Sequence, residues 1–163
     1  MEIRLISPKD NRSEISRVYE ESWKYAYRGI IPQAYLDSIP QGHWADAADR
    51  EGRCSLILLE EGRIVGTSCV SRSRFEELPD WGEIISIYLL PEYIGKGFGH
   101  ALLCAALDEL RQMGFRSVFL WVLKENTRAR CFYERAGFSE SGKVLDDEIG
   151  GKALREVQYI KKI

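Results

Sequence analysis

Apolar positions recur along the chain with two periods, and these periods predict where strands and helices lie. Runs rich in β-branched and aromatic residues are typical of strands, whereas apolar residues three and four apart are typical of amphipathic helices. The sequence predicts strands around 3–5 and over 55–59, 63–72, 84–90, 117–123, 138–144 and 153–160. It predicts helices from 10 or 13 to 25, over 32–38 and 41–51, from a glycine-rich loop to 113, and over 126–136.

The other elements are organised around the stretch from Glu83 to Gly114. An apolar run over Ile84–Leu90 predicts a buried strand, which Pro91 ends because proline cannot donate to a sheet ladder. The segment Tyr93–His100 follows with three glycines and leads directly into a helix. The first turn of a helix leaves its N–H groups unpaired at the positive end of the helix dipole. The order strand, glycine-rich loop and helix therefore predicts a phosphate site.

The glycine-rich loop alone is a weak signal, because a tight turn into a packed helix explains it equally well. A Walker-type phosphate loop does not fit, since Lys96 lies between glycines and not before a terminal Ser or Thr. A Rossmann fingerprint fits poorly, because the following strand does not end in an acidic residue at the expected distance.

Composition and charge limit the classes of protein that fit the chain. The 163 residues suit a single domain over 1–163, and 45% hydrophobic with 29% charged residues is ordinary for a soluble globular protein. A net charge of −2 gives no support for a nucleic-acid surface. Four cysteines without Cys-x-x-Cys spacing, beside two histidines, predict no metal site and reduced thiols. The absence of a signal-peptide core or a membrane-length apolar run leads us to expect a cytoplasmic protein.

A second motif, Asn126–Phe138, identifies a family resemblance. Its sequence, NTRARCFYERAGF, and the glycine-rich loop together resemble the GNAT superfamily of N-acetyltransferases. That family has a loop of the form Arg/Gln-x-x-Gly-x-Gly/Ala and often a later helix of the form Asn-x-x-Ala-x-x-Phe-Tyr-Glu-x-x-Gly-Phe. The resemblance covers essentially the whole chain. Ile94 stands where the family usually has Arg or Gln, which removes one side-chain contribution and leaves the backbone donors intact.

The resemblance implies an α/β (α+β) fold, with a mixed, mostly antiparallel sheet of about seven strands flanked by helices. It also implies an N-acetyltransferase that moves an acetyl group from acetyl-CoA to a primary amine of a small molecule by direct attack in a ternary complex. The cofactor-binding residues implied are Ile87, Tyr88 and Leu89 on the strand edge, Gly95, Lys96, Gly97, Phe98, Gly99 and His100 in the loop, and Asn126. A helix cap would also explain Asn126 without any cofactor contact.

Two residues match the catalytic positions of the resembling family. Glu83, at the start of the central strand, aligns with a general base and could take the proton from a protonated amine. A solvated strand-end carboxylate is the structural alternative. Tyr133 matches the family's general acid, which protonates the departing thiolate, and a core aromatic beside Phe132 is its structural alternative. A backbone N–H near Leu89 would polarise the thioester carbonyl.

The aromatic segment Trp23–Pro32 has two interpretations. It is a packed joint between helices, or it borders the acceptor pocket as it does in the resembling family, which makes Tyr25, Tyr27 and Arg28 candidates for substrate binding. Two other functions stay open: a non-catalytic acyl-CoA-binding or sensing module, and an enzyme that acetylates proteins or peptides. Dimers are common among similar proteins, so a homodimer is possible, but the sequence leaves the oligomeric state open.

Overall fold

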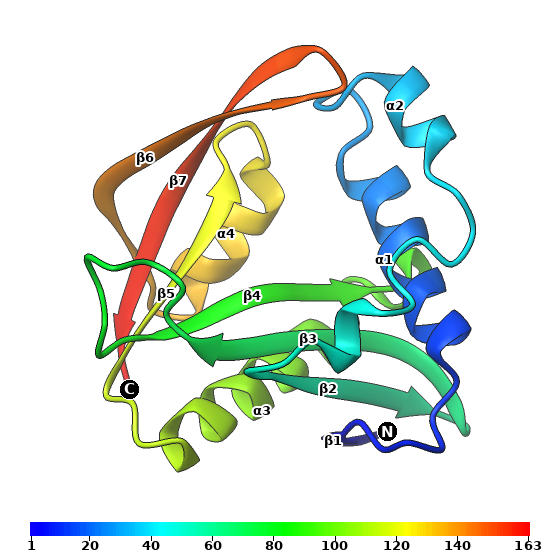
Figure 1. Ribbon diagram of the computed structural model, residues 1–163, viewed down its shortest axis with the longest axis horizontal. Coiled ribbons are helices and arrows are strands. Elements are labelled where there is room, and N and C mark those ends of the chain that lie inside the picture. Colours follow the sequence, from blue (N-terminus) through cyan, green and yellow to red (C-terminus); the bar gives the residue numbers. More distant parts are fainter.

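Seven strands form a single sheet in the computed structural model, which describes all 163 residues (Figure 1). The spatial order of the strands is β1-β2-β3-β4-β5-β7-β6. Their bounds are β1 Glu2–Leu5, β2 Arg53–Glu60, β3 Arg63–Arg72, β4 Gly82–Leu89, β5 Ser117–Leu123, β6 Ser139–Ile149 and β7 Lys152–Lys162. The helices are α1 Arg12–Ala26, α2 Gln33–Ser38, α3 Phe98–Gln112 and α4 Thr127–Arg135, with short 3-10 turns η1 Ala47–Asp49 and η2 Pro91–Tyr93.

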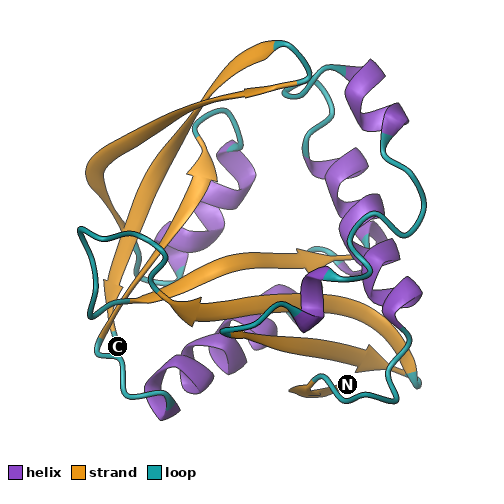
Figure 2. Cartoon of the chain, viewed as in Figure 1, coloured by secondary structure: helices purple, strands orange, loops and turns teal.

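The junction of β4 and β5 is the one parallel pair in an otherwise antiparallel sheet. The two strands pair only at Gly82 with Val118 and at Glu83 with Phe119. Beyond these pairs they diverge, and the two arrows separate visibly in Figure 1. The predicted fold class, a mixed and mostly antiparallel sheet flanked by helices, is confirmed (Figure 2).

Helices α1 and α3 cover opposite faces of β4. Successive side chains of a strand point to opposite faces. Ser86 and Tyr88 point toward α1, because their hydroxyls bond to Tyr19 (2.9 Å) and to the Trp23 indole nitrogen (3.1 Å) respectively. Leu89 points the other way, toward the first turn of α3. The gap between β4 and β5 is therefore accessible from an α1 side and from an α3 side.

Two hydrophobic clusters hold these layers together. The larger cluster joins 25 buried residues from both faces of the sheet, from Ile15 of α1 to Leu110 of α3. The smaller cluster lies on the α1 side and joins the region of α2 to the ends of β5 and β7; its members are Ile31, Leu36, Ile39, Leu123 and Leu154. It packs the segment after α1 against the end of β5 and the start of β7.

The helix predicted over 41–51 is wrong, because this segment forms turns followed only by η1. Two of its backbone amides are bound by side chains of α1, and several others donate to carbonyls three residues earlier, as in isolated turns. Gly42 N–H donates to Glu20 (2.7 Å), and Trp44 N–H donates to the Ser16 hydroxyl (2.9 Å). Buried polar groups on a neighbouring helix thus override the local helical pattern.

The hairpin of β6 and β7 is longer than the sequence predicted. The ladder continues from Glu148–Ala153 to Ile149–Lys152, so that only two glycines form the turn. A Cβ on Gly150 would lie 2.7 Å from the side chain of Tyr35 in α2, and Lys152 Nζ donates to the carbonyl of Ile30 (2.7 Å). The hairpin tip therefore closes against the α1–α2 region.

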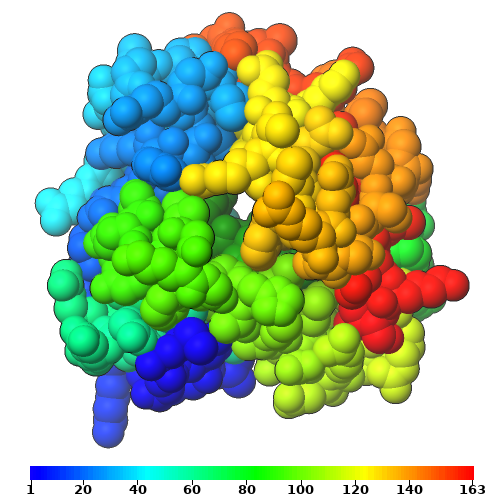
Figure 3. Space-filling view, turned by 180° about the vertical axis from the view of Figure 1, so that it is seen from behind, coloured from blue at the N-terminus to red at the C-terminus, as the bar shows by residue number.

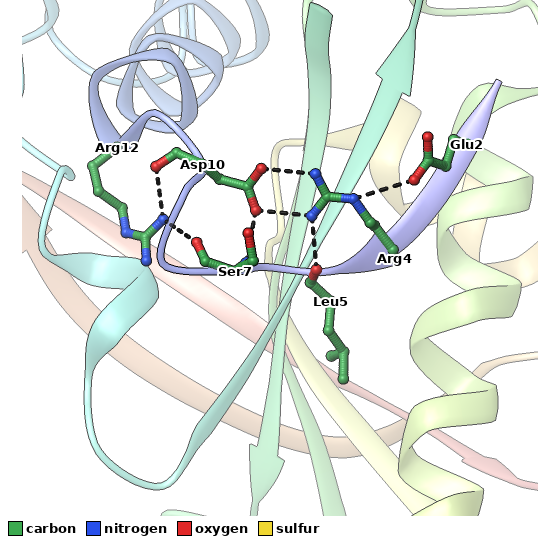
Figure 4. Close-up of polar contacts among 6 residues, drawn as sticks. All are labelled: Glu2, Arg4, Leu5, Ser7, Asp10 and Arg12. Carbon is green, nitrogen blue, oxygen red and sulfur yellow. Dashed lines mark hydrogen bonds and ion pairs between the residues drawn. The ribbon is translucent and has the colours of Figure 1, made fainter. Parts of the chain in front are cut away.

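The start of α1 also differs in detail from the prediction. Neither Asp10 nor Ser13 caps the helix; the side chain of Asn11 does so by accepting from Ser13 N–H (2.9 Å). Asp10 is bound by the Arg4 guanidinium (2.7 and 2.8 Å) and by Ser7 N–H (2.6 Å), as Figure 4 shows. The hydrogen bonds from Arg4 lower the pKa of the Asp10 carboxyl well below its usual value.

No helix in the fold combines the length and the hydropathy needed to cross a bilayer.

Candidate active site

A cavity of about 660 Å³ occupies the place where β4 and β5 separate. Its walls come from the end of α1, Ile31, β4 from Ile84 to Leu89, the glycine-rich loop, β5, α4 and one residue each of β6 and β7. Figure 3 shows an opening in the middle of one face, between the green segment that carries the glycine-rich loop and the yellow segment that carries α4. A gap in the sheet, and not a surface loop, therefore creates the site.

The glycine-rich loop presents a row of free amide donors at one end of this cavity. None of the six N–H groups from Gly95 to His100 donates to a backbone or side-chain acceptor in the protein. Gly97, the N-cap of α3, has a φ of 86°, a left-handed conformation that strongly favours glycine. A Cβ on either Gly95 or Gly97 would meet no atom within 4 Å, so the space above the loop is open. Free amides at the positive end of a helix fit a diphosphate.

The loop side chains divide into two sets. Gly95, Gly97, Gly99 and His100 line the cavity, as does Ile94 before them. Lys96 and Phe98 turn outward onto the ring of Tyr93, at 5.7 Å for the Lys96 ammonium and 5.4 Å between ring centroids for Phe98. These two residues contribute backbone amides to the row but no side chain to the cavity wall.

The edge of β4 supplies backbone groups to the cavity along Ile87, Tyr88 and Leu89. Leu90 N–H donates across the sheet to the carbonyl of Val65 (2.9 Å). Because successive N–H groups of a strand point in opposite directions, Leu89 N–H points away from β3 and into the gap. A donor with this direction can polarise a carbonyl that lies between the two strands.

Tyr133 of α4 reaches the cavity from the α3 side. Its ring is 8% exposed and packs edge-on against Phe132 and Phe138, and its hydroxyl makes no hydrogen bond within the protein. Burial raises the pKa of the Tyr133 phenol well above its usual value, and the neighbouring Tyr88 raises it further. The phenol is therefore protonated across the physiological pH range and has a proton to donate.

Asn126 lines the same wall and caps α4, because its side-chain oxygen accepts a hydrogen bond from Ala129 N–H (3.2 Å).

The structure places Glu83 away from the cavity. Its side chain is 1% exposed, and both carboxylate oxygens are held by the Arg74 guanidinium at 2.7 and 3.0 Å. The backbone N–H of Arg74 adds a third bond at 3.2 Å. A carboxylate fixed in this way joins the start of β4 to the loop after β3, and this geometry does not favour a role in accepting a proton from a substrate.

The residues predicted to bind the acceptor are only partly brought together. Tyr27 lines the cavity, and its hydroxyl lies 3.3 Å from that of Tyr88. Burial raises the pKa of Tyr27 to about 12. Tyr25 is 48% exposed beneath the Arg128 guanidinium, which lies 4.9 Å from the ring centroid, and neither Tyr25 nor Arg28 lines the cavity. Neighbouring positions at the end of α1 thus face either the cavity or solvent.

Several cavity residues were not predicted from the sequence. The polar and aromatic ones include Ser22, Trp23, Trp121, Arg128, Phe132, Arg135 and Glu156. Glu156 is the only acidic residue on the wall. The sequence carried a signal for it, because the alternation of β7 places it between Leu154 and Gln158, which are both buried. Arg128 and Arg135 lie on α4 among other charged residues, so the sequence does not distinguish them from ordinary surface arginines of a helix.

Comparison with known proteins agrees with this geometry. The profile of the Acetyltransferase (GNAT) family matches residues 15–138. The chain belongs to this family. A relative from Bacillus subtilis, the uncharacterized N-acetyltransferase YuaI, is 33% identical over 147 residues, which cover 88% of this chain and 83% of the relative. A spermidine N(1)-acetyltransferase from Thermoplasma acidophilum is 27% identical over 163 residues, 98% of each chain.

Solved structures share the fold of this GNAT protein. The PaiA N-acetyltransferase from Thermoplasma acidophilum in complex with coenzyme A superposes with a TM-score of 0.76 at 23% identity, over all of both chains. A ribosomal-protein-alanine N-acetyltransferase from Brucella melitensis gives a TM-score of 0.75 at 19% identity, also over all of both chains. The protein is an N-acetyltransferase of the acyltransferase class, and acetyl-CoA is its co-substrate. The free amides of the glycine-rich loop and the open space above them fit that co-substrate.

Proposed function

We propose that this GNAT protein acetylates a primary amine of a small molecule, and that the amine attacks acetyl-CoA directly in a ternary complex. The closure of the β6–β7 hairpin against α2 and the segment after α1 is the observation that carries the small-molecule assignment. A protein substrate needs a cleft that is open along its length, and this contact closes one end. The similarity to a spermidine N(1)-acetyltransferase supports the same class of acceptor.

The chain holds acetyl-CoA through three sets of groups in this proposal. The amides of Gly95–His100 bind the diphosphate, and the edge of β4 pairs with the pantetheine amides. Arg128 and Arg135 of α4 line the cavity and add positive charge near an anionic ligand. Leu89 N–H then lies where it can stabilise negative charge that develops on the thioester oxygen.

The reaction needs two proton movements besides the transfer of the acetyl group. A primary amine has an ordinary pKa near ~10.4, so most of it is protonated at neutral pH and must lose a proton before it attacks. The amine nitrogen then bonds to the carbonyl carbon while the carbon–sulfur bond breaks. The nitrogen loses a second proton, and the departing thiolate takes one from Tyr133, so that one proton is released to solvent in each turnover.

Tyr133 is the general acid of this proposal because of its position and its protonation state. It reaches the cavity from α4, on the side of the glycine-rich loop, and its hydroxyl has no partner in the protein. Cys131 on the same helix is exposed, does not line the cavity and has no histidine beside it. Direct transfer is therefore preferred to an acyl-cysteine intermediate.

A thiol-release assay with acetyl-CoA tests the proposal most broadly. The acceptor panel contains alkylamines, diamines, polyamines, amino acids and peptides with free amino termini. We expect turnover with small amines, weak or no turnover with peptides, and double-reciprocal plots that intersect, as a ternary complex requires. Turnover restricted to peptides would point to a protein acetyltransferase, parallel plots would indicate a covalent intermediate, and binding of acetyl-CoA with no turnover would indicate a sensing module.

A further inference from the structure

The acceptor end of the cavity contains one acidic residue that has no role in the steps described above. Glu156 lies on β7, opposite Leu123 of β5, and is the only Asp or Glu on the cavity wall. Its carboxylate makes no hydrogen bond or ion pair with any protein group, although the residue is partly buried. An unpaired carboxylate that faces a cavity costs stability, so a ligand is its natural partner.

The alternation of β7 places Glu156 on the side opposite to Tyr133. Val157 and Tyr159 belong to the core that contains Tyr133, whereas Leu154 packs with the cluster near α2. Glu156 shares the face of Leu154, because residues two apart on a strand point the same way. The carboxylate therefore lies on the α1 side of the gap and the phenol on the α3 side.

The groups around Glu156 suit a cation with an apolar body. Tyr27 and Tyr88 line the same cavity as Glu156. Burial raises the pKa of both phenols, and the Glu156 carboxylate adds a smaller effect in the same direction. Trp23 lies against both of them: its indole nitrogen donates to the Tyr88 hydroxyl, and its ring stands edge-on to Tyr27 with centroids 4.9 Å apart. Aromatic faces beside a carboxylate attract ammonium groups. The arginines of the cavity wall, Arg128 and Arg135, belong to α4, and the Arg128 guanidinium lies 4.9 Å from the ring centroid of Tyr25 at the end of α1.

We propose that Glu156 binds the ammonium group of the acceptor and takes its proton, directly or through one water molecule. The proposal rests on the proposed function and adds the substrate class: primary amines that enter as cations and carry no carboxylate. The proton passes from the ammonium nitrogen to the Glu156 carboxylate, the free amine attacks the thioester, and Glu156 returns the proton to solvent after the product leaves. Glu83, which is bound by Arg74, takes no part in this transfer.

The groups around Glu156 shift its pKa, and this shift predicts how activity depends on pH. Burial raises the pKa of the Glu156 carboxyl above its usual value, Asp147 on β6 raises it further, and Arg74 opposes this by lowering it. Tyr27 and Tyr88 face Glu156 as neutral phenols. Activity should therefore fall, as pH decreases, at a higher pH than an ordinary carboxylate would give. Asp147→Asn should move this acidic limb to lower pH.

The experiment measures kcat/KM for the best small amine from pH 5 to 10 in the wild type, Glu156→Gln and Glu148→Gln. Glu148 is an exposed carboxylate on the adjoining strand and provides the matched control. We expect Glu156→Gln to lower kcat/KM by about 10²- to 10⁴-fold at pH 7, with a smaller loss at pH 10 where free amine is abundant. The Glu148→Gln variant should keep wild-type values, and coenzyme A should bind all three proteins within about twofold by calorimetry.

Four outcomes separate the failure of this inference from the failure of the proposed function. Equal kcat/KM in the wild type and Glu156→Gln overturns the role of Glu156 and leaves the acetyltransferase intact. A Glu156→Gln loss that is the same at every pH also overturns the base role. Turnover of α-amino acids in preference to amines without a carboxylate overturns the proposed substrate class, whereas a wild-type protein with no amine turnover removes the proposed function itself.

Discussion

At the scale of single residues, burial and pairing decide which acids and phenols can take part in chemistry. Tyr133, Glu83 and Glu156 are all partly or fully buried, but only Tyr133 and Glu156 face the cavity without a partner. Glu83 is the more buried of the two acids and the more fully paired. A carboxylate that already has two charged hydrogen bonds stabilises structure, whereas an unpaired one is available to a substrate.

Replacing Tyr133 by Phe removes the proposed proton donor and keeps the ring that packs against Phe132 and Phe138. We expect kcat to fall by about 10²-fold or more, because the thiolate then leaves without a positioned acid. Affinity for acetyl-CoA, measured by calorimetry, should change by less than about threefold. An unchanged kcat would assign Tyr133 to the core and not to catalysis.

Glu83→Gln tests stability rather than proton transfer. The substitution removes the charge that Arg74 binds, and the free energy of unfolding should fall by about 1–3 kcal/mol in a denaturant titration. Any loss of activity should be the same at pH 7 and pH 10. If the loss instead shrinks at high pH, Glu83 acts as the base, and the assignment of that role to Glu156 is refuted.

At the scale of elements, the left-handed glycine before α3 sets the direction in which the chain enters the helix. Gly97 sets the direction of the chain so that the following amides point into open space. Gly114 follows the same helix with a similar conformation, φ 95°; a Cβ there would also meet no atom within 4 Å, and the residue does not line the cavity. The two glycines therefore have similar backbone conformations, but only Gly97 lies on the cavity wall.

Gly97→Ala and Gly114→Ala form a matched pair of variants. Each should lose about 1–2 kcal/mol of stability, because alanine is strained in the left-handed region. Only Gly97→Ala should also weaken coenzyme A binding, by about tenfold, since relief of the strain turns the amides of the first helical turn away from the diphosphate. Titration calorimetry with both variants checks this, and equal affinities would contradict the assignment of the loop.

At the scale of the whole molecule, the separation of β4 from β5 makes one cavity with two sides of different chemistry. The α3 side offers the free amides of the glycine-rich loop, the α1 side offers aromatic rings and one carboxylate, and α4 adds two arginines to the wall. In the proposed reaction, the anionic co-substrate would bind at the amides and the cationic acceptor at the carboxylate, so that the two would meet in the gap. A homodimer stays a prediction that the single chain does not test.

Much of this arrangement was predictable from the sequence, and the remainder has physical reasons. The loop at Gly97 and the tyrosine at 133 lie in local motifs, so their placement in the cavity could be anticipated. The position of Glu156 depends on how the last hairpin closes against α2, a long-range contact that no local pattern encodes. The pairing of Glu83 with Arg74 likewise depends on the conformation of the irregular loop between β3 and β4, which no periodic pattern predicts. Periodicity predicts elements, but it does not predict which polar groups meet.

The most direct test of the central claim is calorimetric titration with coenzyme A, dephospho-coenzyme A and pantetheine. If backbone amides of the glycine-rich loop bind the diphosphate, coenzyme A should bind one to one, dephospho-coenzyme A within about tenfold, and pantetheine at least about 10²-fold more weakly. Absence of heat with coenzyme A, or equal affinity for pantetheine, would contradict the account.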